Sequence, residues 1–143
     1  MKLAIRYIKQ TSNGVKPPIK LILSVLPEKL GICHFDKNSS IPDWAKDTSF
    51  CSISRTPNEL SIVCPQDKIP AGVLVERNWR AFKVQGPLGF VMTGIVASLA
   101  EPLAQAKISI FYISTYETDY LMVEEKNLQI AKKILGKFCD IRE

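Results

Sequence analysis

Two stretches of the chain repeat one pattern at a fixed offset of 60 residues. FCSISRTPNELSIVC begins at Phe50 and IFYISTYETDYLMVE begins at Ile110, so that Ile53 aligns with Ile113 without a gap. In each stretch, β-favouring residues flank a short polar turn, which is typical of a β-hairpin. A repeated hairpin predicts two copies of one supersecondary unit, and this limits the folds open to the chain more than any single motif does.

The segments around the second hairpin predict the order of elements in its unit. Residues 73–84 form a long β-favouring run, and residues 94–106 carry apolar side chains at helical spacing. Residues 127–138 place their apolar side chains on one helical face and their lysines on the other. The order β-α-β-β-α, with a further strand available at residues 73–78, is that of a ferredoxin-like α+β sandwich.

The first half of the chain follows this order with less helix. Residues 21–26 (LILSVL) and 31–35 (GICHF) are strand candidates, whereas residues 41–47 allow at most two helical turns. At the same offset of 60, Pro27 after LILSVL aligns with Pro87 after AFKVQG. We interpret this half as a degenerate first copy; the alternative is a pair of unrelated α+β halves.

The expected fold class is therefore α+β, with two ferredoxin-like βαββαβ units packed together. Residues 1–18 are expected to form a basic N-terminal extension, and residues 19–72 the first, degenerate unit. The turn-rich stretch PQDKIPAG ends that unit. Residues 73–143 are expected to form the second unit.

The strand-to-helix corner of the second unit, FKVQGPLGFVMTG (residues 82–94), contains three glycines and a proline. Glycine permits positive φ and a close approach of the backbone. A helix N-terminus presents about four unpaired N–H groups and a partial positive charge, which favour an anion. Thr93 is predicted as the N-cap, and Leu88, Phe90 and Met92 are expected to wall an apolar space. The pattern fits either a pocket for a carboxylate or a tight turn whose apolar side chains belong to the core.

The GPL corner, the Thr-Gly helix start and the ISIF-IST-Y-TDY strand and turn together resemble the small bacterial proteins built from paired ACT domains. They resemble, more distantly, the ACT-based arginine sensors of animal cells. LSVLPEKLGICHF and SRTPNELSIVCP resemble the first, degenerate half of the same proteins. The resemblance covers about residues 19–138.

The resemblance implies a ligand-sensing or regulatory module without chemistry of its own, in which an amino acid binds where a strand-to-helix loop meets a neighbouring domain. An aspartate is usual in this family where Gly89 stands, so a partner for a ligand's ammonium or guanidinium group is missing here. The implied ligand-binding residues are, in the corner, Gly86, Pro87, Leu88, Gly89, Phe90, Val91, Met92, Thr93 and Gly94, and, in the facing segment, Ser114, Thr115, Tyr116, Thr118 and Asp119.

The charge of the chain does not favour nucleic-acid binding. Of the 19 basic residues, five lie in residues 1–20, which hold no acid, and the remaining 14 basic residues balance the 14 acidic ones. A basic pI usually suggests a nucleic-acid partner, but no basic face recurs along either helix. No apolar run approaches the roughly 20 residues that cross a bilayer, and no signal-peptide cleavage site follows the start, so we expect a cytoplasmic protein without a membrane partner.

The four cysteines, Cys33, Cys51, Cys64 and Cys139, show no metal-binding spacing, so no zinc or other metal is expected. In a cytosolic chain they are expected to be reduced, small hydrophobic residues. A disulfide between Cys51 and Cys64 is the alternative, because these two could face each other across the hairpin that turns at Pro57.

One stretch favours an enzymatic function: VQGPLGF is similar to the V-Q-G-x-x-F-R loop of acylphosphatases. That loop needs an arginine directly after the phenylalanine to hold the phosphate, and this chain has Val91 there. Without the charge, backbone amides alone would have to stabilise the phosphoryl group. The sequence shows no catalytic set elsewhere, so no enzyme activity and no cofactor are expected.

The leading hypothesis is a regulatory module that binds a small amino-acid-like ligand at an inter-domain or inter-subunit corner, as a homo-oligomer or with a protein partner. The alternative is a ligand-free interaction module whose sheet edges mediate oligomerisation.

Overall fold

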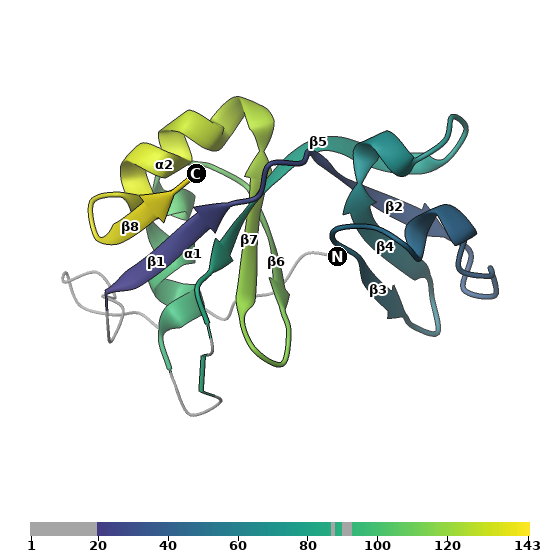
Figure 1. Cartoon of the computed structure of the whole chain (residues 1–143), viewed down its shortest axis with the longest axis horizontal. Coiled ribbons are helices and arrows are strands. Elements are labelled where there is room, and N and C mark those ends of the chain that lie inside the picture. The colour runs from purple at the N-terminus through teal and green to yellow at the C-terminus, as the bar shows by residue number, and fades with distance from the viewer. Residues whose placement is uncertain (1–19, 87, 90–92) are drawn as a thin grey trace.

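The computed structural model describes residues 20–86, 88–89 and 93–143, and in this part of the chain eight strands form one sheet. Neighbouring strands follow the order β3-β4-β2-β5-β1-β8, while β7 pairs with both β5 and β6. Figure 1 shows two lobes that share the long strand β5, with the helices α1 and α2 in one of them. The α+β class and the two ferredoxin-like units predicted from the sequence are confirmed.

The first unit contains little helix. Its strands are β2 (Leu30–Phe35), β3 (Ser52–Arg55), β4 (Leu60–Pro65) and the first half of β5 (Leu74–Val84). The 3-10 turns η1 (Asp43–Ala45) and η2 (Gln66–Lys68) stand where a complete unit would have helices. This lobe has a core of its own around Cys33, Leu60, Ile62 and Cys64.

The second unit has the full βαββαβ order. β5 is followed by α1 (Ile95–Gln105), β6 (Ile110–Ser114) and β7 (Asp119–Glu124). The 3-10 turn η3 (Glu125–Asn127) then leads into α2 (Leu128–Leu135), and the unit ends in β8 (Cys139–Arg142). The second helix ends at Leu135, before the predicted end at Phe138, and β8 lies where the sequence pattern indicated no strand, since its four residues follow directly on a turn.

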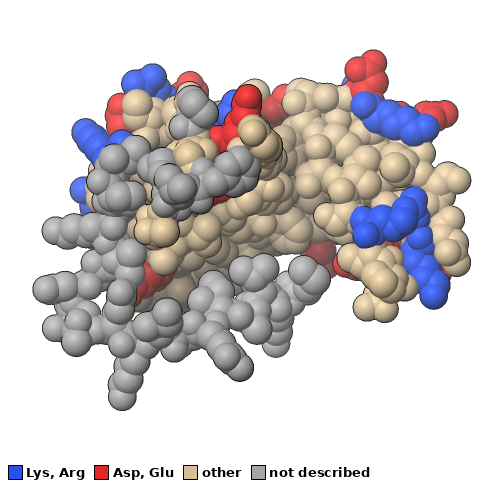
Figure 2. All heavy atoms as spheres, turned by 90° about the horizontal axis from the view of Figure 1, so that it is seen from below, with Lys and Arg blue, Asp and Glu red and all other residues tan. Residues whose placement is uncertain are grey.

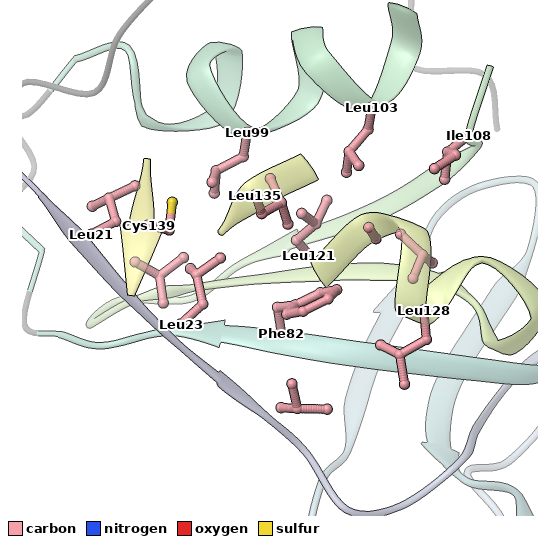
Figure 3. Close-up of a cluster of buried hydrophobic side chains, with 14 of the residues drawn as sticks. Leu21, Leu23, Phe82, Leu99, Leu103, Ile108, Leu121, Leu128, Leu135 and Cys139 are labelled. Atoms are coloured by element: carbon pink, nitrogen blue, oxygen red, sulfur yellow. The ribbon is translucent and has the colours of Figure 1, made fainter. Parts of the chain in front are cut away.

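The core of the second unit lies between the helices and one face of the sheet. Leu99 and Leu103 point from α1 towards Leu121 and Leu135 (Figure 3), and all four are fully buried. Phe82 on β5 is also fully buried and belongs to the same cluster. Burying each such side chain contributes on the order of 1.5–3 kcal/mol, so this layer holds α1 and the corner before it in place.

The strand β1 (Leu21–Val25) inserts between β5 and β8. It runs antiparallel to β5, with Leu23 opposite Val84, and parallel to β8, with Leu21 opposite Cys139. By order in the sheet, the counterpart of β5 in the first unit is β2, so aligning LILSVL with AFKVQG was wrong although the two hairpins do correspond. The division of the chain after residue 72 stays a prediction, and β1 pairs with strands of the second unit.

β5 changes partners near Asn78, and this joins the two units. Its first half pairs with β2, and its second half pairs with β1 and β7. Asn78 has a φ of 63°, and its N–H donates a 2.7 Å hydrogen bond to Oε1 of Gln66. A third cluster of buried side chains, which draws on both units, covers the junction: Leu30, Val63, Ala81 and Met122.

Candidate functional site

A pocket of about 420 Å³ lies at the N-terminus of α1, between the loop that follows β5 and the β6–β7 turn. The loop contributes Leu88 and Gly89, and the facing wall is the turn from Ser114 to Asp119. The residues that line the pocket are Leu88, Gly89, Gly94, Ile95, Val96, Ala97, Ser114, Thr115, Tyr116, Glu117, Thr118 and Asp119. The two segments that the sequence analysis placed opposite each other therefore meet.

The N-terminus of α1 carries no side-chain cap. Gly94 is the N-cap residue, with a φ of 82°, and no side chain accepts a hydrogen bond there. The prediction that Thr93 is the N-cap was wrong, because the chain enters the helix one residue later through a left-handed conformation that glycine adopts without strain. The first intrahelical bond runs from Ser98 N–H to Gly94 O at 2.9 Å.

The first turn of α1 is therefore electropositive towards the pocket. The N–H groups of Ile95, Val96 and Ala97 precede that first bond and have no intrahelical acceptor. The turn contains no acidic residue that would neutralise the helix dipole. All three residues line the pocket, so the amides suit a carboxylate or another small anion.

The β6–β7 turn is fixed by hydrogen bonds of its own. Thr115 donates to Thr118 O from its N–H at 2.8 Å and from its hydroxyl at 2.9 Å. Thr118 N–H donates back to Oγ1 of Thr115 at 3.3 Å. The side chain of Thr118 is buried, and its hydroxyl donates to Val84 O at the end of β5. The turn is thus tied to the strand that begins the corner.

Gly86 is required by a close backbone contact. A Cβ at this position would lie 2.9 Å from Glu117 O and 3.3 Å from Cβ of Thr118. Two residues later, Leu88 N–H donates to the same Glu117 O at 2.8 Å. This glycine therefore allows the corner loop to lie against the β6–β7 turn, which fixes the width of the pocket.

The wall opposite the helix is acidic. Glu117 and Asp119 both line the pocket, and none of its described lining residues is a lysine, arginine or histidine. Oδ2 of Asp119 accepts a 2.8 Å hydrogen bond from the hydroxyl of Tyr112. Burial, and then the neighbouring Asp119, raise the pKa of Tyr112, so this phenol keeps its proton and serves as a donor. The pocket thus has residues with unpaired helix amides on one side and two acidic residues on the other.

Most of the predicted site residues meet at this pocket. Gly86 and Thr93 flank it without lining it. Pro87, Phe90, Val91 and Met92 lie outside the described residues. The sequence analysis missed Glu117, which stands between two residues that it named. It also missed Ile95, Val96 and Ala97, although its argument from unpaired helix amides points to these positions.

Among residues 20–86, 88–89 and 93–143, no group of three or more His, Cys, Asp and Glu side chains could hold a metal ion. No helix in that part of the chain is long and apolar enough to cross a membrane.

Two family models match the chain, one in each half. The family model of the ACT domain matches residues 74–137, and a second family model, described as an N-terminal domain, matches residues 28–72. The human cytosolic arginine sensor for mTORC1 subunit 1 is 37% identical over 107 residues, which are 69% of this chain and 32% of that protein. The chain thus spans about a third of the length of the curated relatives that it matches first.

Solved structures match over nearly the whole described chain. An X-ray structure of a protein from Agrobacterium tumefaciens superimposes with a TM-score of 0.81 at 39% identity, covering 86% of this chain and 92% of that one. A Vibrio cholerae protein of unknown function shares the fold with a TM-score of 0.70 at 21% identity, covering 85% of this chain and 91% of that one. With its βαββαβ unit at residues 74–142 and the match of the ACT-domain model to residues 74–137, the chain belongs to the ACT-domain family.

Proposed function

We propose that this chain is a regulatory module that binds a small amino-acid-like ligand in the pocket at the N-terminus of α1. The observation that carries the proposal is the uncapped first turn of α1, which faces Glu117 and Asp119 across a pocket of about 420 Å³. A zwitterion has the matching charges at matching ends, and the volume lies in the usual range of about 300–1,000 Å³ for small-molecule sites.

In the proposed pose, the α-carboxylate accepts hydrogen bonds from the amides of Ile95, Val96 and Ala97. The ammonium group faces the other wall, to which the acidic residues Glu117 and Asp119 belong. They supply the negative charge that the family usually places at the position of Gly89. The ligand's remaining atoms lie beside Leu88, which is half-buried at the pocket.

The comparisons support the class of function. The ACT family match and the similarity to an arginine sensor point to amino-acid recognition and regulation instead of catalysis. By the same analogy we propose a cytoplasmic location, and a readout through a second copy or through a protein partner.

A thermal-shift screen of the twenty amino acids tests ligand binding. A ligand at a hundredfold excess over its Kd should stabilise the folded state by about 2.7 kcal/mol. We expect at least one amino acid to raise the Tm in a concentration-dependent way. Failure of all twenty at millimolar concentration would count against the proposal.

A charge variant locates the binding site. Ala97 is an exposed residue in the first turn of α1, and Ala97→Glu places a carboxylate where the ligand's own carboxylate is proposed to bind. It should abolish the ligand-induced shift and leave the fold intact, because acids are tolerated at helix N-termini. Ala104→Glu, at an exposed position near the other end of α1, is the matched control and should retain the shift.

The competing proposal, a ligand-free interaction module, draws support from the surface. Figure 2 shows a broad uncharged area on the described part of the face seen from below, with acidic and basic side chains at its margins. Tyr116, at the pocket rim, is 80% exposed. If light scattering shows an oligomer that Ala97→Glu leaves intact, and no ligand shifts the Tm, the interaction module is the better description.

A further inference from the structure

Three cysteines lie on neighbouring segments of the first unit. Cys51 directly precedes β3, Cys64 lies on β4, and Cys33 lies on β2, and β4 pairs with both other strands. All three thiols are free. Cys33 and Cys64 are buried, whereas Cys51 is exposed. This gives a surface thiol next to an interior one.

The strand register places Cys51 opposite Cys64. The β3–β4 ladder ends at the pair Ser52–Val63, and Cys51 and Cys64 occupy the next position on each side. Thr56 N–H donates to Glu59 O at the hairpin end, which makes that pair hydrogen-bonded. Since the two kinds of pair alternate along an antiparallel ladder, the Cys51–Cys64 position is of the non-hydrogen-bonded kind.

If the ladder is continued by one position beyond Ser52–Val63, it gives the Cys51–Cys64 pair the spacing of a disulfide. Residues in a non-hydrogen-bonded pair have Cα atoms about 4.5 Å apart and side chains on the same face, and disulfides join Cα atoms about 4.4–6.8 Å apart. Cys33 is placed differently: it lies opposite Ile62, and Cys64 lies opposite Gly31. Such a diagonal pair is about 7–8 Å apart at Cα, so Cys33 could bridge to Cys64 only if the backbone moved.

The thiols also differ in acidity. A hydrogen bond from Cys64 lowers the pKa of Cys33, and the same bond, together with burial, raises the pKa of Cys64. Burial, followed by the nearby Cys64, raises the pKa of Cys51. The exposed thiol therefore reacts slowly at neutral pH and faster as the pH rises, because the thiolate is the nucleophile.

We propose that Cys51 and Cys64 form an oxidation site, at which a hydroperoxide converts the two thiols into a cross-strand disulfide. The exposed Cys51 attacks the peroxide first, which gives a sulfenic acid and water. The sulfur of Cys64 then attacks the sulfenic sulfur, the S–S bond forms, and a second water leaves. The two thiols lose two protons and two electrons, and hydrogen peroxide takes up both and is reduced to two waters.

The disulfide would link the start of the edge strand β3 covalently to β4. The link would lie next to a contact between the first and the second unit. Phe50, the neighbour of Cys51, packs edge-on against Tyr120 of β7 with ring centroids 4.9 Å apart. Tyr120 adjoins Asp119 of the pocket. The oxidation site therefore stands at the point where the β3–β4 hairpin touches the strand that carries the acidic wall.

Peroxide treatment of the full chain tests the proposal. The protein is incubated with hydrogen peroxide, the remaining thiols are alkylated under denaturing conditions, and the peptides are mapped by mass spectrometry. We expect a disulfide-linked Cys51–Cys64 peptide pair, with Cys33 and Cys139 alkylated. The yield at a fixed time should rise between pH 7 and pH 9. A Cys33–Cys64 bridge, a disulfide between two chains, or a Cys51 that overoxidises while Cys64 remains a thiol would each overturn the proposal.

Variants add an independent check. Cys51→Ser changes an exposed residue, so it should fold, and it should protect Cys64 from peroxide. Cys139→Ser, which alters a buried cysteine of the second unit, is the matched control and should form the bridge as the parent does. If Cys64 is oxidised equally in Cys51→Ser and in the parent, the exposed thiol is not the entry point and the proposal fails.

Discussion

The hydroxyl of Tyr112 on β6 donates a 2.8 Å hydrogen bond to Oδ2 of Asp119 on β7. The two residues belong to neighbouring strands, and Asp119 also lines the pocket at the N-terminus of α1. One oxygen of the carboxylate is thereby held by the protein itself. The orientation of the acidic wall thus depends on a tyrosine that does not line the pocket.

Tyr112→Phe should weaken the response of stability to alkaline pH. Burial and Asp119 raise the pKa of Tyr112 above its ordinary value of about 10 in the unfolded chain. Above that pH the unfolded state releases the proton and the folded state keeps it, so the unfolding free energy falls as the pH rises. Below about pH 10 this contribution is fully present.

Denaturant titrations at pH 8 and pH 11 measure the effect. The parent chain should lose more unfolding free energy between the two pH values than Tyr112→Phe does. Tyr116→Phe, at an exposed position, is the control and should behave as the parent. Equal losses in all three chains would contradict a raised pKa at Tyr112.

Gly86→Ala should destabilise the corner and widen the pocket. Its Cβ would meet the backbone oxygen of Glu117 at 2.9 Å, and overpacking of this kind costs about 1–3 kcal/mol. The loop must then move away from the β6–β7 turn. We expect both a lower Tm and a loss of the ligand-induced shift.

Gly72→Ala provides the comparison for this glycine. Gly72 has open space around it but a φ of 88°, so alanine there costs roughly 1–2 kcal/mol of backbone strain far from the pocket. It should lower the Tm and keep the ligand response. If Gly86→Ala also keeps that response, the contact with Glu117 does not shape the site.

The elements that the sequence predicted well are those encoded by neighbouring residues. The two hairpins follow from turn residues such as Thr56, whose hydroxyl accepts the N–H groups of Asn58 and Glu59. Helix α1 follows from its apolar spacing. By contrast, the insertion of β1 beside β8 depends on pairing across more than a hundred residues, which no local pattern specifies.

In the candidate site, too, local features were predictable from the sequence, whereas features that depend on distant contacts were not. Its two segments were named correctly because glycines and a polar turn are visible in sequence. The N-cap was placed one residue early because Thr93 is the better capping side chain, whereas the chain uses the positive φ of Gly94. Glu117 was overlooked because an exposed turn residue gives no sign of facing a pocket until the loop that covers it is placed.

Thr118→Val should lower stability without changing side-chain volume much. The Thr118 hydroxyl donates to Val84 O in a buried setting, and leaving such an acceptor unsatisfied costs about 1–3 kcal/mol. Urea unfolding should show a lower midpoint with an unchanged m-value. Thr93→Val, at an exposed position outside the helix, is the control and should leave the urea midpoint within error. If both variants lower the midpoint equally, the buried hydrogen bond from Thr118 to Val84 O makes no specific contribution to stability.

Replacing Asn78 by glycine should change the stability little, whereas replacing it by valine should lower the stability. Its φ of 63° lies in the left-handed region, which glycine enters freely, which asparagine adopts at little cost and which a β-branched residue strongly resists. The conformation turns β5 from its partner β2 towards β1 and β7, so strain here acts on the junction between the units. Gln66 supports the bend by accepting the N–H of Asn78.

Asn78→Val should therefore lower the unfolding free energy by at least about 1–2 kcal/mol, while Asn78→Gly should remain within about 1 kcal/mol of the parent. Chemical denaturation is followed by the fluorescence of Trp79, which packs against Phe111 at 6.4 Å in the shared cluster. All chains carry Trp44→Phe, because Trp44 is the other tryptophan of the sequence. Val75 on the same strand has ordinary strand pairing with Cys33, so Val75→Ile is the control for a β-branched side chain in β5 and should not unfold the junction. If Asn78→Val lowers the unfolding free energy no more than Val75→Ile does, the left-handed conformation at residue 78 is not what directs β5 from one unit into the other.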